Sequence, residues 1–275
     1  MEVILAEYLG FCYGVKRAIR LAKDSAANGN SVTLGPIIHN PQMVERLASE
    51  GVSPVNALSD APDGSTVIIR SHGVGPKVYE EAHSRHLMLI DATCPHVKKA
   101  QMAADSLAKD GCRVIIIGEK KHPEVKSIFE WSGGNAIIIE NDDEAKEVPS
   151  CGKMGIVAQT TFSSEKFEHL VSLLLGKSND IHIVRTICTA TDQRQEAALS
   201  LARQVDLMLV IGGRNSANTT RLAELCSKET TTYHLETKDE LKDEWFESIK
   251  KIGITAGAST PDWIIREVYQ KCKMK

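Results

Sequence analysis

Three segments of the chain share one order of hydrophobic and polar positions. Each begins with a run rich in Val, Ile and Leu, continues to a cysteine, and then spaces apolar residues by three and four positions. The apolar runs predict β-strands, and the spacing after each cysteine (Cys12, Cys94 or Cys188) predicts an amphipathic helix. The expected buried helix faces are Val15, Ala18, Ile19 and Ala22 in the first copy, Val97, Ala100, Ala104, Leu107 and Ala108 in the second, and Ala198, Leu201, Ala202 and Val205 in the third.

The similarity continues downstream of each helix. A strand, a polar loop, a second helix, another strand and another polar loop follow in the same order in all three copies. The first of these loops holds His39, His122 or Ser216, which lie 27, 28 and 28 residues after the cysteine of their copy. The chain therefore contains an internal repeat of roughly 80–95 residues.

This repeat predicts the fold class. Strands that alternate with helices indicate parallel sheets, because a helix must carry the chain back to the start of the next parallel strand. We expect an α/β protein of three similar units with mainly parallel sheets, in a pseudo-three-fold arrangement around one central cavity. The expected boundaries are 13–94, 95–188, and 189–275 joined by 1–12. The competing interpretation is one doubly wound sheet with a C-terminal extension. In both folds, ligands bind beyond the carboxyl ends of the strands, where the cysteines and polar loops fall.

Composition narrows the class of protein. The chain carries a net charge of −3, and 42% of its residues are hydrophobic and 25% charged, which is ordinary for a folded globular protein. A pI near 6.3 argues against nucleic-acid binding, since phosphate contacts need a basic surface. No apolar run approaches the ~20 residues that cross a bilayer. The N-terminus lacks a basic start and carries Glu2 and Glu7, so we expect a first β-strand and a cytoplasmic protein rather than a signal peptide.

The seven cysteines fall into two groups, and no CxxC pair is present to indicate a zinc finger. The three repeated cysteines are expected to bind one metal centre together, since a helix N-terminus favours the thiolate. Their separations of 82 and 94 residues do not match the local run of electron-carrying ferredoxins. Three thiolates leave one position open, for an activated water on zinc or for a substrate oxygen on a [4Fe–4S] cluster. The cysteines expected to be structural are Cys112, Cys151, Cys226 and Cys272.

The polar loops indicate a site for an anion. Histidine and neutral hydrogen-bond donors gather there, next to predicted helix N-termini whose free N–H groups can bind a diphosphate. Glu124 follows His122 by two residues, in the expected first turn of a helix. Such an acid is favoured by the helix dipole alone, or it serves as a proton donor in a closed polar cavity. The loop residues with this expectation are His39, His72, His122, Thr160, Ser216, Asn218 and Ser259.

Several long motifs are spread over essentially the whole chain. They are GFCYGVKRAI, RSHGV, DATCP, GEKKHPEV, AQTT, TICTATDQRQEA, NSANTTRLAEL and TAGASTPDW, together with the His-Asn pair after the second strand. These motifs resemble the 4-hydroxy-3-methylbut-2-enyl diphosphate reductase family, which catalyses the last step of the non-mevalonate isoprenoid pathway. The family fold implies three α/β domains around a central iron–sulfur cluster.

The resemblance also implies roles for individual residues. Cys12, Cys94 and Cys188 match the ligands of a [4Fe–4S] cluster with an open apical iron. Glu124 matches the proton-delivering acid, and Thr160 the threonine near the substrate hydroxyl; with His122 they form the expected catalytic group. Some members of the family carry a second serine at the position of Ala217. In this chain, only the backbone of Ala217 could contact the substrate there. The implied diphosphate pocket consists of His39, His72, His122, Thr160, Ser216, Ala217, Asn218 and Ser259.

The implied reaction is reductive dehydroxylation of (E)-4-hydroxy-3-methylbut-2-enyl diphosphate to isopentenyl and dimethylallyl diphosphates, with two electrons and protons consumed and water released. The resemblance also implies that a ferredoxin or flavodoxin supplies the electrons, and no NAD or flavin motif is visible in the chain. No nucleic acid or membrane is expected as a partner. Three alternatives stay open at this point. They are a cluster-dependent lyase that needs no reductant, a non-enzymatic iron–sulfur sensor or scaffold, and a zinc hydrolase.

Overall fold

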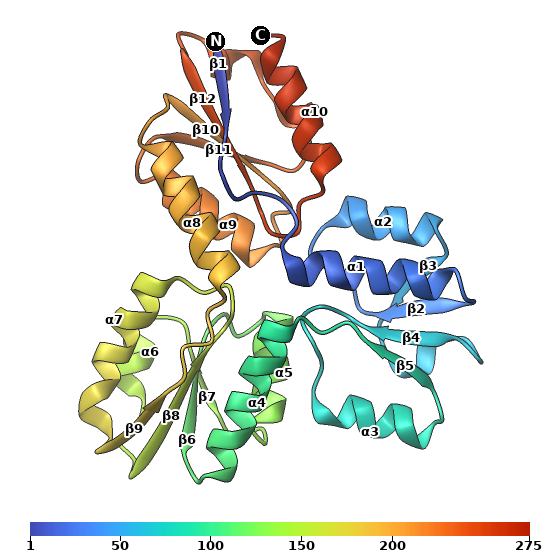
Figure 1. The fold of residues 1–275 in the computed structure, drawn as a ribbon. Helices are drawn as coiled ribbons and strands as arrows, with labels where there is room; N and C mark the ends of the chain where they lie inside the picture. Colours follow the sequence, from blue (N-terminus) through green and yellow to red (C-terminus); the bar gives the residue numbers. More distant parts are fainter. The chain divides into compact units, whose positions relative to one another are not determined.

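The computed structural model describes all residues from Met1 to Lys275 as twelve β-strands and ten α-helices (Figure 1). The strands form three four-stranded sheets, here named A, B and C. Sheet A holds β1 (Glu2–Leu5), β10 (Leu207–Ile211), β11 (Thr231–Leu235) and β12 (Lys251–Ala256). Sheet B holds β2 (Ser31–Leu34), β3 (Val52–Val55), β4 (Thr66–Ile69) and β5 (Met88–Asp91). Sheet C holds β6 (Arg113–Ile117), β7 (Ile137–Ile139), β8 (Lys153–Ala158) and β9 (Asp180–Ile183).

The helices connect these strands, and none of them is long and apolar enough to cross a membrane. Their bounds are α1 (Tyr13–Ala26), α2 (Pro41–Ser49), α3 (Pro76–Ser84), α4 (Pro95–Lys109), α5 (Pro123–Trp131), α6 (Asp142–Glu147), α7 (Ser164–Leu174), α8 (Thr189–Ala202), α9 (Ala217–Cys226) and α10 (Asp262–Lys273).

All three sheets have the same strand order. They run β3-β2-β4-β5, β7-β6-β8-β9 and β11-β10-β12-β1, and every strand pair is parallel. The prediction of three α/β units with parallel sheets is therefore confirmed, and the single doubly wound sheet is wrong. In each sheet, the strand that leads into a repeated cysteine lies at an edge, and in sheet A this strand is the N-terminal β1. The exact unit boundaries stay a prediction.

By its packing, the chain divides into two compact parts. Unit 1 consists of Met1–Lys16, Ile38–Glu45 and Thr189–Lys275 and contains sheet A. Unit 2 consists of Arg17–Ile37 and Arg46–Cys188 and contains sheets B and C.

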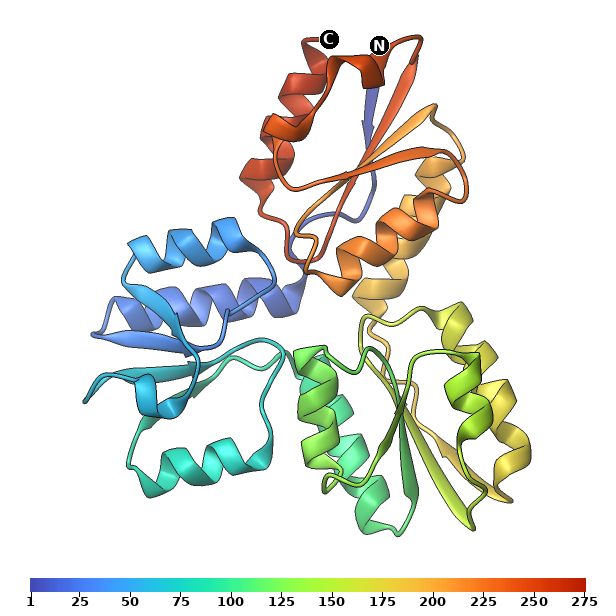
Figure 2. The same ribbon diagram turned by 180° about the vertical axis from the view of Figure 1, so that it is seen from behind.

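Helices cover both faces of sheet A, because its central strands are apolar on both faces. Along β10, Met208 and Val210 pack against α8 and α9, while Leu207, Leu209 and Ile211 pack against α10 on the other face. Figures 1 and 2 show α10 on one side of this sheet and α8 with α9 on the other. Sheet C repeats the arrangement, with α4 and α5 on one face and α6 and α7 on the other.

The helices that follow the cysteines lie close to the central strands. Gly155 of β8 and Gly253 of β12 occupy the third position of their strands. A methyl group at Gly155 would come within 2.9 Å of Leu107 of α4, and one at Gly253 within 2.9 Å of Leu201 of α8. The absence of a side chain at both positions therefore allows α4 and α8 to pack tightly.

Candidate functional site

The three repeated cysteines each stand immediately before a helix, as predicted. Cys12 precedes α1, Cys94 precedes α4 and Cys188 precedes α8, and all three are half-buried. The carbonyl groups of Cys12 and Cys94 accept the first helical hydrogen bonds of α1 and α4, from Lys16 at 3.0 Å and Lys98 at 2.9 Å. The thiols therefore sit where the partial positive charge of a helix N-terminus stabilises an anion.

The other cysteines belong to the apolar cores. Cys112, Cys226 and Cys272 are buried, and Cys151 is half-buried against the core of sheet C. Burial raises the pKa of Cys226 to about 12 and that of Cys272 to about 11. These thiols stay protonated at neutral pH and do not act as thiolate ligands. The chemical environment thus separates the cysteines into the two groups that the sequence predicts.

One backbone hydrogen bond anchors each repeated cysteine to a polar loop. For each of the three sheets, the cysteine N–H donates to a carbonyl in the loop that follows the central strand next to the edge, namely β12, β4 or β8. The two sequence features of each repeat, the cysteine and the second polar loop, are therefore held together directly. The three bonds are Cys12 to Ala258 at 3.1 Å, Cys94 to Ser71 at 2.9 Å, and Cys188 to Thr160 at 3.0 Å.

In unit 1, a polar cluster forms at the N-terminus of α9. Ser216 is the N-cap of this helix and accepts a hydrogen bond from the N–H of Thr219 at 3.4 Å. Ser259, from the loop after β12, donates to the carbonyl of His39 at 3.0 Å, and its hydroxyl lies 3.4 Å from that of Ser216. Unit 1 therefore brings together three of the predicted diphosphate-binding residues.

Asn218 lies in the first turn of α9 and is only 4% exposed. Neither its amide nitrogen nor its amide oxygen has a hydrogen-bond partner in the chain. Burying such a group without a partner costs about 1–3 kcal/mol, so the amide is poised for a ligand. Ala217, at the first helical position, offers its backbone but no side-chain oxygen.

The loop that holds His39 begins α2 in the same manner. Asn40 is 1% exposed and accepts a hydrogen bond from the N–H of Met43 at 2.8 Å, which caps α2. His39 precedes this cap, just as Asn215 precedes Ser216 before α9. The cap fixes the backbone of the loop and thereby the carbonyl of His39 that Ser259 contacts.

In unit 2, Glu124 is a buried acid in the first turn of α5, with 2% of its surface exposed. One carboxylate oxygen accepts from the N–H of Thr160 at 2.5 Å, and the other from the Thr160 hydroxyl at 2.9 Å. Burial raises the pKa of Glu124 to about 7, against the opposing effect of these two hydrogen bonds. The carboxyl group can therefore hold and release a proton near neutral pH, as a general acid must.

His122 is the N-cap of α5, and its ring has a defined tautomer. Its Nδ1 atom accepts a hydrogen bond from the N–H of Glu124 at 3.2 Å, which places the proton of the neutral ring on Nε2. The ring of His72, from the loop after β4, stands edge-on to it, with a centroid distance of 5.5 Å and an interplanar angle of 82°. Unit 2 thus brings together two of the predicted histidines next to the predicted acid.

Two buried positioning residues were not indicated by the sequence. Ser127 of α5 lies 2.8 Å from the Glu124 carbonyl and 3.2 Å from the His72 carbonyl. Gln101 of α4 is fully buried and donates to the Ser127 hydroxyl at 3.1 Å. Gly73 has φ +72°, and a side chain there would collide with Gln101, so only glycine fits. The sequence feature that could have indicated this network is Gln101 itself, a polar residue on the otherwise apolar buried face of α4.

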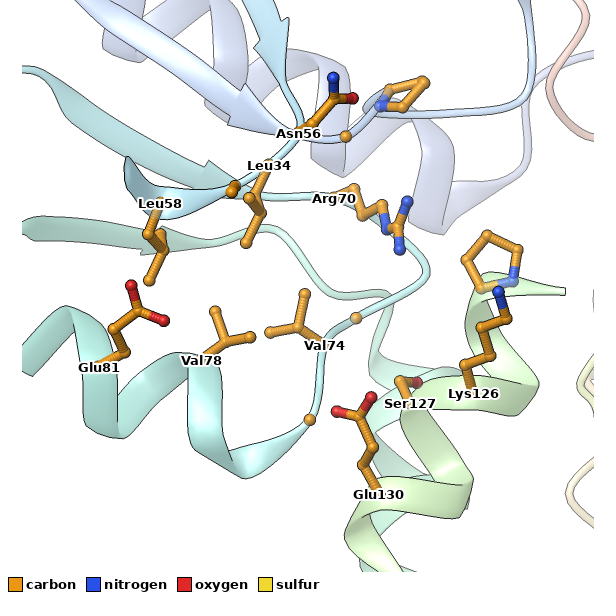
Figure 3. Close-up of a pocket in the computed structure, with 16 residues that line it drawn as sticks. Leu34, Asn56, Leu58, Arg70, Val74, Val78, Glu81, Lys126, Ser127 and Glu130 are labelled. Carbon is orange, nitrogen blue, oxygen red and sulfur yellow. The ribbon is translucent and has the colours of Figure 1, made fainter. Parts of the chain in front are cut away.

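A pocket of about 430 Å³ lies beside these loops in unit 2 (Figure 3). Arg70, the last residue before Ser71, extends into it and toward Lys126 of α5. Burial lowers the pKa of Arg70, and the carboxylate of Glu130 opposes this effect. The Nε atom of Arg70 has no hydrogen-bond partner in the chain. The pocket therefore holds two cations, Arg70 and Lys126, and two carboxylates, Glu81 and Glu130, next to the loops of His72 and His122.

Comparison with known proteins identifies the family. The LytB protein family matches residues 3–273. A protein of Geotalea uraniireducens is 48% identical over 273 residues, which cover 98% of this chain and 96% of that protein. A protein of Geobacter metallireducens is 47% identical over 275 residues, covering 99% and 97%. Both are named 4-hydroxy-3-methylbut-2-enyl diphosphate reductase.

Two solved structures are also similar. One is a structure of (E)-4-hydroxy-3-methyl-but-2-enyl diphosphate reductase, described as the terminal enzyme of the non-mevalonate pathway; it has a TM-score of 0.74, 44% identity and full coverage of both chains. The other is the E-1-hydroxy-2-methyl-but-2-enyl-4-diphosphate reductase of Plasmodium falciparum, with a TM-score of 0.93, 30% identity, and coverage of 99% of this chain and 87% of that one. The resemblance seen in the motifs is thereby confirmed, and the chain belongs to the LytB protein family.

Proposed function

We propose that the chain is an oxidoreductase that converts (E)-4-hydroxy-3-methylbut-2-enyl diphosphate to isopentenyl and dimethylallyl diphosphates. Beyond family membership, one structural observation carries this proposal. The buried acid Glu124 is paired with Thr160, and the carbonyl of Thr160 accepts the N–H of Cys188. A proton donor and a candidate cluster ligand are thus held close together through a single residue, which supports a reduction coupled to loss of water.

The family is an iron–sulfur family. The cluster proposed here is a [4Fe–4S] cluster on Cys12, Cys94 and Cys188. Their donor chemistry supports it, because they are half-buried thiols at helix N-termini, unlike the buried cysteines of the cores. When bound, the cluster would supply electrons and an open iron for the substrate hydroxyl. Thiolates bind zinc as well, and membership of an iron–sulfur family is what favours an iron–sulfur enzyme over a zinc hydrolase.

Glu124 holds the proton that leaves with the substrate hydroxyl as water. Its raised pKa keeps this proton in place near neutral pH, and the two hydrogen bonds from Thr160 fix the direction of the carboxyl group. Thr160 therefore orients the acid and contributes a hydroxyl on the same side. His122 fixes the first turn of α5, from which Glu124 projects, and its Nε2–H is a donor for the substrate.

The diphosphate is bound by neutral donors at helix N-termini rather than by a cluster of lysines. Ser216 and Asn218 project from the start of α9, where the N–H of Ala217 is also available. The partnerless amide of Asn218 supports this role. The proposed set is completed by Ser259 and by the histidines His39, His72 and His122.

The reaction consumes two electrons, which a protein donor must supply because the chain has no NAD or flavin motif. We assign this role to a ferredoxin or flavodoxin. The test is anaerobic purification with iron and sulfide counts, followed by incubation with reduced methyl viologen and the allylic diphosphate. Formation of the two isoprenyl diphosphates supports the proposal. Turnover without a reductant would instead identify a lyase, and an iron-loaded chain that binds the diphosphate without converting it would refute enzymatic function.

The turnover rate is expected to fall as pH rises through about 7, because Glu124 must be protonated to act as an acid. The measurement is the pH profile of turnover with reduced methyl viologen, whose potential does not depend on pH.

Folding stability gives an independent check of the raised pKa of Glu124. The unfolded chain releases the Glu124 proton near its ordinary pKa of 4.5, but the folded chain releases it near 7, so folded stability falls across this interval. The melting temperature should therefore fall between about pH 4.5 and pH 7 because of Glu124, and Glu124→Gln should remove this contribution.

Replacing Asn218 by alanine is expected to raise KM for the diphosphate roughly 10- to 100-fold, since a hydrogen bond to a charged group contributes about 1.5–3 kcal/mol. Steady-state kinetics with reduced methyl viologen measures the change. Asn215→Ala is the matched control, because Asn215 belongs to the same loop but is exposed. Equal KM values for the two variants would contradict the role of Asn218.

A further inference from the structure

We propose that an exposed face formed by α1 and α4 is the docking surface for the acidic protein that delivers electrons to this enzyme. This inference rests on the proposed function and deepens it by naming the surface at which electrons enter the enzyme. The face, here named the α1–α4 face, consists of Arg17, Arg20, Lys98, Lys99 and Met102. All five residues belong to unit 2.

The α1–α4 face surrounds a shallow pocket of about 470 Å³. Arg17 of α1 lines one side, and Lys98, Lys99 and Met102 of α4 line another. Thr93 and Pro95 also line the pocket, so the chain passes through Cys94 along its wall. The surface therefore lies next to one of the three proposed cluster ligands along the chain.

The positive charges of this face are held in place but are largely not neutralised by carboxylates. The guanidinium of Arg17 donates to the carbonyl groups of Thr93 at 3.2 Å and Asp91 at 3.3 Å, which are uncharged acceptors. The ammonium of Lys98 stands 5.0 Å from the ring centre of Tyr79 and 4.6 Å from that of Trp131. Arg17 is thus oriented by neutral groups alone, whereas Lys98 stands over two aromatic rings and also lies near one carboxylate, that of Asp91.

Asp91 is the one carboxylate that lines the pocket. It lies 3.9 Å from Lys98 and accepts hydrogen bonds from the Tyr79 hydroxyl and the Thr93 N–H, both at 2.9 Å. Lys99 and Arg20 are exposed, and Arg20 stands one turn after Arg17 on α1. The α1–α4 face therefore carries four cations and one anion on a chain whose total charge is −3.

This charge distribution fits an acidic protein partner better than a small ligand. An open, shallow basic surface attracts a partner over a long range and speeds its association, and weak electron-transfer complexes have small interfaces of this kind. Met102, which is 39% exposed, gives the surface an apolar contact within the ring of charges. Electron transfer slows steeply with distance, so a donor seated here would gain by its proximity to Cys94.

The test compares two electron sources with the double variant Arg20→Glu/Lys99→Glu in the iron-loaded enzyme. With a reduced acidic ferredoxin at low ionic strength, kcat/KM for the ferredoxin is expected to fall about tenfold or more, because charge reversal replaces attraction by repulsion. With reduced methyl viologen, which needs no docking surface, turnover is expected to stay at the wild-type rate. Rising salt should lower the ferredoxin-driven rate of the wild type and affect the variant much less.

The matched control is Arg113→Glu/Lys166→Glu, which makes the same change in net charge at two exposed positions elsewhere in unit 2. It should keep ferredoxin-driven turnover near the wild-type rate. An equal loss in both double variants would overturn the proposal, since only net charge would then matter. An unchanged ferredoxin rate, or a raised KM for the diphosphate with methyl viologen, would overturn it as well. Failure of the wild type with methyl viologen would instead refute the proposed function.

Discussion

Replacing Glu124 by glutamine is expected to lower turnover by about 10²- to 10⁴-fold, the usual contribution of a positioned general acid. Glutamine has nearly the same shape, and its amide oxygen can still accept the hydrogen bond from the Thr160 N–H. Its amide nitrogen then takes the place of the second carboxylate oxygen and donates to the Thr160 hydroxyl oxygen, which reverses that hydrogen bond. Glutamine cannot release a proton to the leaving hydroxyl. The visible absorption of the cluster and the affinity for the diphosphate should therefore stay close to wild type. Steady-state turnover with reduced methyl viologen, and titration of the diphosphate against the cluster spectrum, measure the two effects.

Glu165→Gln is the control for this experiment. Glu165 is an exposed acid in the first turn of α7, the position that Glu124 occupies in α5. If an acid at this position served only the helix dipole, the two substitutions would have similar and small effects. Wild-type turnover by Glu124→Gln would rule out its role as proton donor.

Replacing Cys94 by alanine is expected to abolish turnover and to leave the purified chain with little iron and sulfide. Alanine removes a thiolate donor without adding a polar group, and a cluster on two remaining cysteines has too few protein ligands. Iron and sulfide counts after anaerobic purification, together with turnover, measure the loss. Cys12→Ala and Cys188→Ala should give the same result, because the three cysteines are proposed as one ligand set.

Cys151→Ala provides the comparison within the same chain. Cys151 is half-buried, as Cys94 is, but it packs against the core of sheet C. Its replacement should leave iron content and turnover near wild type. Full iron content and full activity in Cys94→Ala would contradict the assignment of Cys94 as a cluster ligand. Circular dichroism of both variants tests whether each is still folded.

The elements next to the site could be predicted because their signals are local. Ala100 and Ala104 repeat at helical spacing and are fully buried in α4, and Pro95 begins this helix as expected. The strands β3, β7 and β11 were not indicated. They are partly exposed, β7 has only three residues, and β3 contains Pro54, which weakens the strand pattern. Only pairing with β2, β6 and β10 makes them strands.

By itself, the sequence determined which residues stand at the ends of strands and the starts of helices. Periodicity and helix capping act over a few residues, so Cys94, His122 and Ser216 could be placed without coordinates. The tertiary structure alone decided which of these residues contact one another and how their pKa values shift. The pairing of Glu124 with Thr160 joins residues from different elements, and the burial that raises the Glu124 pKa depends on the packing of α5 against sheet C. Neither hydrogen bonds between distant segments nor solvent exclusion can be read from local spacing, because both arise only once the chain has folded.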